Sequence, residues 1–388
     1  MNNAMTFQSQ LRPLFFLTSI FLLNFTIRII ISPLLPTILH DMSLTGDQAG
    51  SLFLMSALGY FITLICSGFV SEKLLHKKTI GLSAVMTGIF FIITSFCNSL
   101  AMMRIGIFIT GMAAGLYLPS GIAMLTASIS KQNWGKAIGV HELAPNFSFL
   151  IAPIVCEAML LWISWRSVLM VTGLMSMILG IIFLKFSKVK DFPGQSPKFN
   201  VLLQLLSSRS FWIMILLFTA GVTGTMGIYA MLPLYLVNEH GMLQTQANTL
   251  ITLSRIMTLP MPFAVGWVSD RYGMKKTLTG VLILTGIFTL SLGLLSGSGL
   301  QVAVFFQPLL SVCFFPPAFS ALSNIGVKET RNVMVSLTIP AAFLMGGGAA
   351  PTLIGFLADN GFFAMGVVGA GIAISAAALL PFFLKIEK

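Results

Sequence analysis

Long apolar runs separated by short polar stretches fill this chain from end to end. A membrane-spanning helix needs about 20 consecutive apolar residues, and twelve segments approach or exceed that length. They lie near residues 13–37, 49–70, 79–97, 99–129, 137–162, 167–184, 211–237, 248–268, 277–295, 300–325, 333–356 and 362–384. The pattern predicts an all-α membrane protein with twelve transmembrane helices.

A twelve-residue segment occurs twice, at residues 68–79 and 266–277, an offset of 198 residues. Each copy joins two long apolar segments, and matched prolines recur at the same offset in other segments. Such internal duplication is typical of secondary transporters, whose two halves move around a central site. We therefore expect an N-terminal six-helix bundle over 1–184, a cytoplasmic linker over 185–210 and a C-terminal six-helix bundle over 211–388.

The charged residues are few and unevenly placed. Only 9% of residues are charged against 56% hydrophobic, and the formal net charge is +11. Of the 22 Lys and Arg residues, 18 lie at the termini or in alternate loops, and only Arg166 lies in the other loops. This asymmetry argues against nucleic-acid binding and, by the positive-inside rule, places both termini in the cytoplasm. We therefore expect a multi-pass protein of the plasma membrane, and specifically of the bacterial inner membrane.

The repeated loop resembles the motif between spans two and three of the major facilitator superfamily. The second copy matches that motif fully with Gly266, Asp270, Arg271, Gly273, Lys275 and Lys276. The first copy keeps Gly68 and Glu72 but has Leu75 at the position of the second glycine. The resemblance implies two pseudo-symmetric six-helix bundles. We expect these glycines and charges to hold the cytoplasmic side shut in one conformation, although they are also consistent with mere topology signals. The antiporter signature of the family is missing from span five.

Two arginines interrupt apolar segments near the middle of the membrane. A charge there costs about 2.5–3.5 kcal/mol on insertion scales and needs a partner, a cavity or a route to the surface. Arg28 lies in span one, one helical turn after Asn24, and Arg255 lies in span eight. Guanidinium groups bind carboxylates and phosphates through paired hydrogen bonds, and anion transporters of the resembling family carry a span-eight arginine. We expect both arginines to contact an anionic substrate, together with Asn24, Tyr229 and Asn146; a buried structural ion pair is the alternative.

Further ionisable residues lie in spans four and five. His141 and Glu142 are candidates for proton coupling, because histidine titrates near neutral pH and a buried carboxylate can be shifted there. Alternatively, Glu142 neutralises a nearby Lys or Arg. Arg104 and Glu157 lie at similar depth, and we expect them to form a structural ion pair.

These features favour a secondary transporter that moves a small organic anion by alternating access, coupled to protons or to a counter-anion. An exporter of amphipathic drugs or metabolites is the first alternative, and a non-transporting membrane receptor or scaffold is the second. The chain lacks the short motifs of hydrolytic and metalloenzymes, so we expect neither an enzyme, a cofactor nor a metal site. We expect a monomer whose partners are the substrate, the coupling ion and the lipid bilayer.

The charge asymmetry predicts the topology. A reporter fused after Lys388 should be cytoplasmic, and a reporter inserted at Asp359 should be external, because basic loops remain inside. Alkaline phosphatase and fluorescent-protein fusions would measure this. An external C-terminus would overturn the count of twelve spans.

Overall fold

The computed structural model describes residues 7–194, 205–323, 325 and 328–384, and their regular elements are all helices. The N-terminal helices are α1 (Phe7–Ile29), α2 (Ile31–Met42), α3 (Gly46–Leu74), α4 (His76–Ser95), α5 (Leu100–Gly115), α6 (Tyr117–Ser128), α7 (Trp134–Leu160) and α8 (Trp165–Phe186), with a short turn η1 (Lys131–Asn133) before α7. Part of the predicted linker, residues 195–204, lies outside the described residues.

The C-terminal helices repeat this order. They are α10 (Arg209–Val222), η2 (Thr223–Gly227), α11 (Ile228–Asn238), α12 (Gln244–Ile256), α13 (Met261–Tyr272), α14 (Met274–Leu294), α15 (Gly297–Ser311), η3 (Val312–Phe314), α16 (Phe315–Ser323), α17 (Lys328–Leu344), η4 (Met345–Ala349), α18 (Ala350–Asp359), α19 (Phe363–Ala377) and η5 (Leu380–Phe383). Eleven helical runs in the described part are long and apolar enough to span a membrane, and the bent pair α12–α13 makes twelve.

Three spans break at a proline placed four residues after the last helical residue, and two of them carry a buried arginine; in the third, α5 ends at Gly115 and Pro119 follows. Helix α1 ends at Ile29 and Pro33 follows; α12 ends at Ile256 and Pro260 follows. A proline lacks the amide hydrogen and its ring clashes with the carbonyl four residues earlier. Span eight, expected as one continuous helix, is therefore bent by 44° between α12 and α13.

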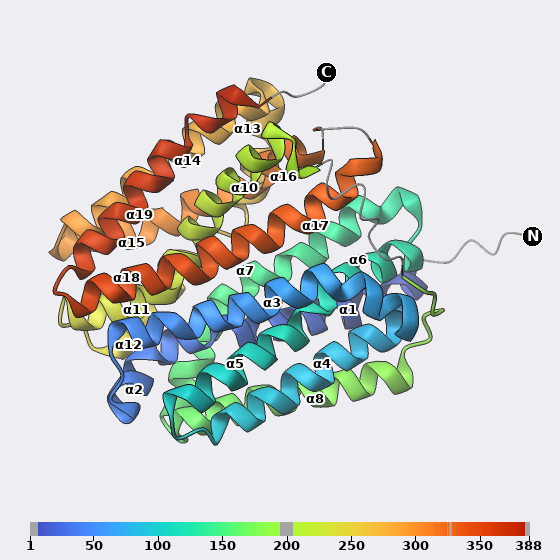
Figure 1. Cartoon of the computed structure of the whole chain (residues 1–388), viewed down its shortest axis with the longest axis horizontal. Coiled ribbons are helices and arrows are strands. Elements are labelled where there is room, and N and C mark those ends of the chain that lie inside the picture. The colour runs from blue at the N-terminus through green and yellow to red at the C-terminus, as the bar shows by residue number, and fades with distance from the viewer. Residues whose placement is uncertain (1–6, 195–204, 324, 326–327, 385–388) are drawn as a thin grey trace, which may run out of the picture.

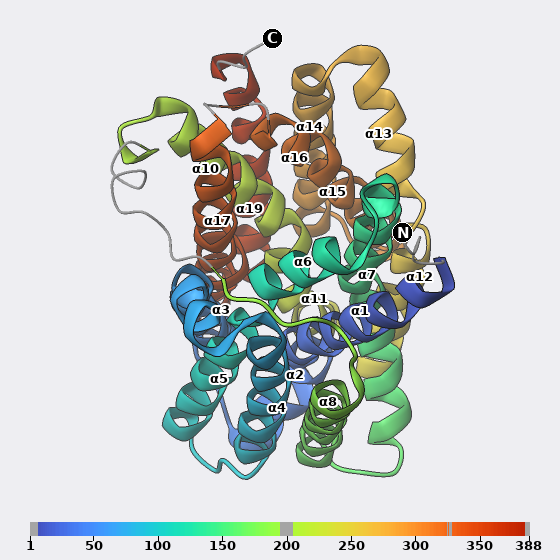
Figure 2. The ribbon, with the colours of Figure 1, turned by 90° about the vertical axis from the view of Figure 1, so that its right-hand side faces the viewer.

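The two halves lie side by side, the N-terminal half blue to green and the C-terminal half yellow-green to red (Figures 1 and 2). They pack together through α2 with α11, α7 with α12, and α3 with α18 and η4. We call the end of the bundle that holds Met42, Gly46, Asn238, Gln244 and Asp359 the closed end. The opposite end, which holds the start of α1 and η5, is called the terminal end.

Asp359 fastens the closed end across the two halves. Its carboxylate, at the end of α18, accepts hydrogen bonds from the backbone amides of Gly46 and Asp47 (2.5 and 2.8 Å) at the start of α3. An anion at a helix N-terminus satisfies free amides and interacts favourably with the helix dipole. The helices approach closely there, since a Cβ on Gly355 would lie 2.1 Å from the Gly46 carbonyl oxygen.

A polar seam joins α2, α7 and α12 nearby. The Asn248 side-chain amide donates to Glu157 Oε1 (2.6 Å) and to the Pro33 carbonyl (3.1 Å). Gln244 donates to the same carbonyl (2.9 Å) and accepts from Thr37 (2.8 Å). The carbonyl that accepts from both Asn248 and Gln244 belongs to Pro33, the proline that breaks span one. The break in span one therefore also supplies the acceptor that joins α2 to α12.

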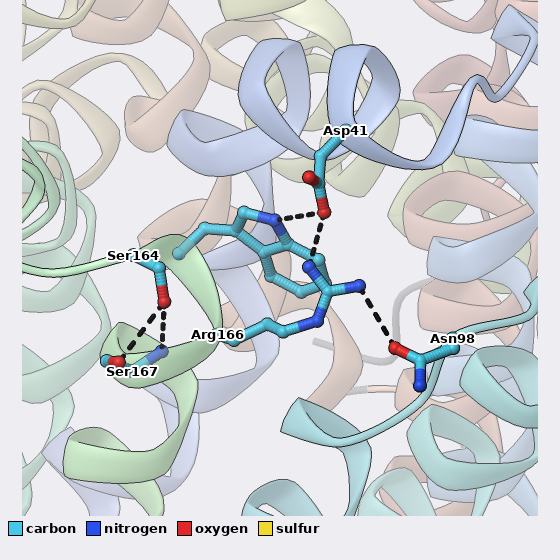
Figure 3. Close-up of polar contacts among 6 residues, drawn as sticks. Asp41, Asn98, Ser164, Arg166 and Ser167 are labelled. Atoms are coloured by element: carbon cyan, nitrogen blue, oxygen red, sulfur yellow. Dashed lines mark hydrogen bonds and ion pairs between the residues drawn. The ribbon is translucent and has the colours of Figure 1, made fainter.

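The N-terminal half is braced on its own surface at the closed end (Figure 3). The Asp41 carboxylate accepts from Arg166 and from the Trp165 indole (3.0 Å for the latter). Arg166 also reaches the Asn98 side chain (3.4 Å) and lies 4.2 Å from the Trp165 ring centroid. These contacts tie α2 to α8 and to the connection between α4 and α5.

Asp359→Ala should loosen the closed end. Two hydrogen bonds to a charged carboxylate are lost, which we expect to cost about 1–2 kcal/mol, a shift of about five- to thirtyfold toward separation of the halves. Spin labels at Trp162 and Phe362, two exposed residues on opposite halves, would report this as a longer distance population.

The matched control is Asn360→Ala. Asn360 neighbours Asp359, but its side chain donates to Phe356 within its own half (2.8 Å). If the two variants give the same distance distribution, the carboxylate does not fasten the closed end.

Candidate functional site

A small cavity lies between the halves at mid-height. It holds about 20 Å³, room for about one water, and is lined by Arg28, Ile29, Phe53, Ser56, Ala57, Met226, Tyr229, Ala230, Phe343 and Gly347. Gly347 belongs to η4, and Met226 to η2, the two π-helical turns of the C-terminal half. Such turns are frequent at functional sites.

Arg28 lies in the last turn of α1, directly before the break caused by Pro33. Its side chain is 6% exposed. The guanidinium carbon lies 3.7 Å from the Tyr60 ring centroid and 5.1 Å from that of Phe343. Arg28 is therefore held between an aromatic side chain of each half.

Arg255 occupies the same local position in α12, in its last turn before the break caused by Pro260. The residue is 2% exposed, and its guanidinium carbon lies 4.5 Å from the Phe149 ring centroid and 5.0 Å from that of Tyr229. Thr258 donates to the Arg255 carbonyl (2.6 Å), which satisfies one backbone group freed by the break. Tyr229 thus lies beside Arg255 while it lines the cavity with Arg28.

Within the described residues, neither arginine has an acidic partner; the ion pairs there are His141–Glu142 and Asp41–Arg166. Four buried polar atoms of Arg28, Arg255 and the neighbouring Tyr229 lack a hydrogen-bond partner among the described residues: Arg28 Nε, Arg255 Nε, Arg255 Nη1 and the Tyr229 hydroxyl. What stabilises the cations is the negative end of a helix dipole and the faces of aromatic rings. The unpartnered donors leave the site able to bind an anion.

Aromatic residues connect the two arginines, and sequence reasoning missed most of them. The Phe149 ring lies 5.3 Å from Phe25 and 4.7 Å from Tyr229, and Phe25 lies 5.5 Å from the Arg28 guanidinium. With 33 phenylalanines in the chain, no single one stood out. A usable signal existed for Phe149, which follows Glu142 and Asn146 along one face of α7 at helical spacing.

Two of the predicted substrate-contacting residues, Asn24 and Asn146, do not line the cavity. The Asn24 amide donates to the Ala114 carbonyl (3.1 Å), beside the junction of α5 and α6, so it links span one to span four. Asn146 is half-buried on α7, and no described hydrogen bond joins it to either arginine. The cavity lining described above includes neither residue.

His141 and Glu142 are in contact although adjacent helical residues point about 100° apart. His141 Nδ1 lies 3.1 Å from Glu142 Oε1, and its Nε2 lies 2.9 Å from the Tyr117 hydroxyl. The His141 side chain is fully buried, stacked 4.5 Å from Phe21, whereas the Glu142 side chain is 44% exposed. Tyr117 was not among the predicted proton-coupling residues.

The predicted ion pair of Arg104 and Glu157 is not formed. Arg104 donates through Nε to Ser51 (2.8 Å) on α3, and Glu157 accepts from Asn248 on α12. The two residues share a depth, but α5 packs against α3 and α4 while α7 packs against α1 and α12. A similar depth in the membrane therefore did not determine which helix faces pack against each other.

The repeated loops lie at the terminal end. Glu72, Asp270, Arg271 and Lys276 are exposed, and among the described side chains neither Glu72 nor Asp270 has a partner. A Cβ on Gly266 would meet no atom within 4 Å. The close contacts expected of Gly68 and Gly266 in a shut gate are therefore not formed at Gly266 in this conformation, and Lys275 donates to the Leu384 carbonyl (2.7 Å) in its own half.

The first loop copy contacts the start of the linker. Lys77 Nζ donates to the Ser187 carbonyl (2.6 Å), and the Lys77 amide donates to Asp191 (2.8 Å). Leu75, which replaces the glycine of the motif, has φ 68°, close to the φ of 86° at Gly273. The turn geometry is thus kept without glycine, and such a conformation is strained for leucine.

An apolar groove lies between α1 and α7. Its volume is about 590 Å³, and it is lined by Leu11, Leu14, Phe15, Thr18, Ser19, Leu22, Val140, Leu143, Ala144, Phe147 and Ile151. No charged side chain is among these residues.

The sequence matches the Major Facilitator Superfamily over residues 15–338, and again over 224–388. The membrane sensor protein UhpC of Escherichia coli is 23% identical over 386 residues, covering 89% of this chain and 86% of the relative. The probable sulfoacetate transporter SauU of Cupriavidus necator is 25% identical over 161 residues, covering 42% and 37%. The quinolone resistance protein NorA of Staphylococcus aureus is 29% identical over 134 residues, covering 34% and 32%.

Solved structures share the fold. A bacterial homologue of the human lysosomal transporter Spinster, in an inward-facing and unoccupied conformation, superposes with a TM-score of 0.80 at 15% identity and covers 97% of both chains. The fucose:proton symporter FucP of Escherichia coli gives a TM-score of 0.68 at 17% identity, covering 98% of this chain and all of the other.

Asp270→Asn should favour the conformation of this structure, in which Asp270 has no partner among the described side chains. The contacts expected of the Asp270 carboxylate form only when the terminal end shuts, so the substitution removes them from the opposite conformation alone. A cysteine placed at Asn146, half-buried on α7, should then react faster with a water-soluble maleimide. Glu239→Gln, an exposed acid at the closed end, is the control. Equal labelling rates in both variants would reduce the loop to a topology signal.

Proposed function

Because the chain belongs to the Major Facilitator Superfamily, we propose that it moves a small organic anion across the bacterial inner membrane by alternating access, coupled to protons or a counter-anion. One observation carries the proposal: each half supplies one buried guanidinium that has no acidic partner among the described side chains. Arg28 lines the cavity, and Arg255 lies against Tyr229, which also lines it. A carboxylate, sulfonate or phosphate would pair with the free donors. The name of the relative SauU gives an anion of this kind as its probable substrate.

Alternating access fits the placement of the contacts. The halves pack at the closed end, while at the terminal end a Cβ on Gly266 would meet no atom within 4 Å, and neither Glu72 nor Asp270 has a partner among the described side chains. If both termini are cytoplasmic, as the charge asymmetry predicts, this is an inward-facing conformation, and the Spinster homologue of similar fold is described as inward-facing. In the opposite conformation, the residues of the two repeated loops would then make contacts across the halves of a single chain. These residues are Gly68, Glu72, Gly266, Asp270, Arg271, Lys275 and Lys276.

Two further functions have specific support. Export of amphipathic compounds is favoured by the apolar groove between α1 and α7 and by the relative named a quinolone resistance protein. A sensor without transport is favoured by the relative named a membrane sensor, which is matched over most of both chains.

Ligand-dependent thermal stabilisation of the purified protein separates these functions. We expect stabilisation by organic anions, with sulfoacetate, a dicarboxylate and a sugar phosphate as probes, and none by a fluoroquinolone. Arg255→Lys should weaken binding about tenfold or more, because it keeps the charge but loses the planar fork, about 1.5 kcal/mol for one charge-assisted hydrogen bond. Arg255→Ala should abolish the stabilisation and still fold.

Arg104→Lys is the matched control, since Arg104 is also a membrane arginine but bonds Ser51 away from the cavity. Normal anion binding by Arg255→Ala would make Arg255 structural and remove the support for an anion. Stabilisation by the fluoroquinolone alone would favour export of amphipathic compounds. Anion binding without flux in proteoliposomes would favour a sensor.

A further inference from the structure

A chain of hydrogen bonds joins three helices of the N-terminal half. The Tyr117 hydroxyl on α6 lies 2.6 Å from the Leu17 carbonyl oxygen on α1 and 2.9 Å from His141 Nε2 on α7. His141 Nδ1 then lies 3.1 Å from Glu142 Oε1. Tyr117, Leu17 and His141 are buried, so water does not replace a missing donor among them.

The position of the hydrogen atoms follows from counting donors. A hydroxyl has one hydrogen to donate, and a carbonyl oxygen only accepts. The Leu17 carbonyl therefore takes the Tyr117 hydrogen, and the hydroxyl accepts from His141. His141 must carry its hydrogen on Nε2 in every state in which this chain is intact.

That hydrogen decides what Nδ1 can do. With Nε2 protonated, the neutral imidazole presents a lone pair on Nδ1, and an ionised carboxylate also presents only lone pairs. The observed contact between Nδ1 and Oε1 thus requires one extra proton, either on His141 as an imidazolium or on Glu142 as a carboxylic acid. When this proton leaves, two lone pairs face each other and the contact opens.

We propose that His141 and Glu142 form a binding site for one proton, and that Tyr117 creates this requirement by holding His141 as a donor through Nε2. The proton site itself does not depend on the proposed transport function. Only its role as the site of the coupling ion rests on that function. The proton enters through Glu142, which is 44% exposed on the α7 face that leads to Phe149 and Arg255. Its loss frees Glu142, while the hydrogen bonds from His141 Nε2 to Tyr117 and from Tyr117 to the Leu17 carbonyl still tie α7 to α6 and α1.

The surroundings contain few competing charges. The α1 contacts are Phe21 and the Leu17 backbone, and the α6 contact is Tyr117. Glu142 also interacts electrostatically with Tyr60 of α3 and with Tyr117. Lys131 of η1 and Lys136 of α7 are the nearest bases in sequence, and among the described residues of α8 and α12 none forms an ion pair with Glu142.

Nitrogen NMR of protein labelled with ¹⁵N only in histidine tests the assignment directly, because the chain has four histidines and His141→Gln identifies the signal. In the unmodified protein we expect Nε2 to stay protonated over the pH range, while Nδ1 changes from hydrogen-bonded to free in a one-proton step. In Tyr117→Phe the hydroxyl is gone, so the ring hydrogen moves to Nδ1, which can donate to an ionised Glu142. The one-proton step should then be lost.

Tyr235→Phe is the matched control. Tyr235 is a buried tyrosine that donates to the Leu292 carbonyl (3.0 Å) and makes no hydrogen bond to His141. Its variant should leave the His141 signals unchanged. A ring hydrogen on Nδ1 in the unmodified protein at alkaline pH, or unchanged tautomers in Tyr117→Phe, would overturn the proposal.

Glu142→Gln provides a second test if Tyr117→Phe fails to fold. The glutamine amide donates to Nδ1 without a proton, so the His141 signals should become independent of pH. In proteoliposomes with sulfoacetate as the probe, this variant should lose accumulation driven by a pH gradient and keep exchange. Failure of sulfoacetate to be transported by the unmodified protein would count against the proposed substrate, whereas a persistent pH step in Glu142→Gln would overturn the proton site.

Discussion

Two guanidiniums are buried in the membrane with no carboxylate partner among the described side chains, and the contacts at the centre of the structure are arranged around this constraint. Each cation lies in the last turn of a helix that ends inside the bilayer, close to the negative end of the helix dipole. Aromatic rings cover the planar faces at 3.7 Å for Arg28 and 4.5 Å for Arg255. These neutral contacts stabilise the charge while leaving hydrogen-bond donors unused.

Because the halves are duplicated, the counterpart of each arginine can be located. At the offset of 198 residues, Arg28 corresponds to Met226 and Arg255 corresponds to Ala57, and both apolar residues line the same cavity. The halves thus share a fold but divide the charges between them. An anion that contacts both guanidiniums would join the halves at their centre, where otherwise ring contacts and packed glycines connect them.

The sequence predicted the architecture well because its evidence is local and repeated. Span lengths, the duplicated loop and matched prolines each point to two bundles of six helices. Arg28 and Arg255 were found because a charge in an apolar segment is rare. Phe149 and Tyr117 were missed or left without a role, since an aromatic residue in an apolar helix carries no such contrast. The predicted Arg104–Glu157 pair is wrong because similar depth does not determine which helix faces meet, and the break in span eight shows that Pro260 outweighs an otherwise continuous apolar pattern.

The two broken spans that carry a buried arginine share a spacing that has a consequence for related sequences. Arg28 precedes Pro33 by five residues, and Arg255 precedes Pro260 by five residues. The proline fixes where each helix ends, so the spacing fixes the rotation of the arginine around the helix axis, and one inserted residue would turn it by about 100°. An arginine five residues before a proline, inside an apolar run, is therefore a pattern that can be searched for in uncharacterised membrane proteins as a marker of a cation held at a helix end.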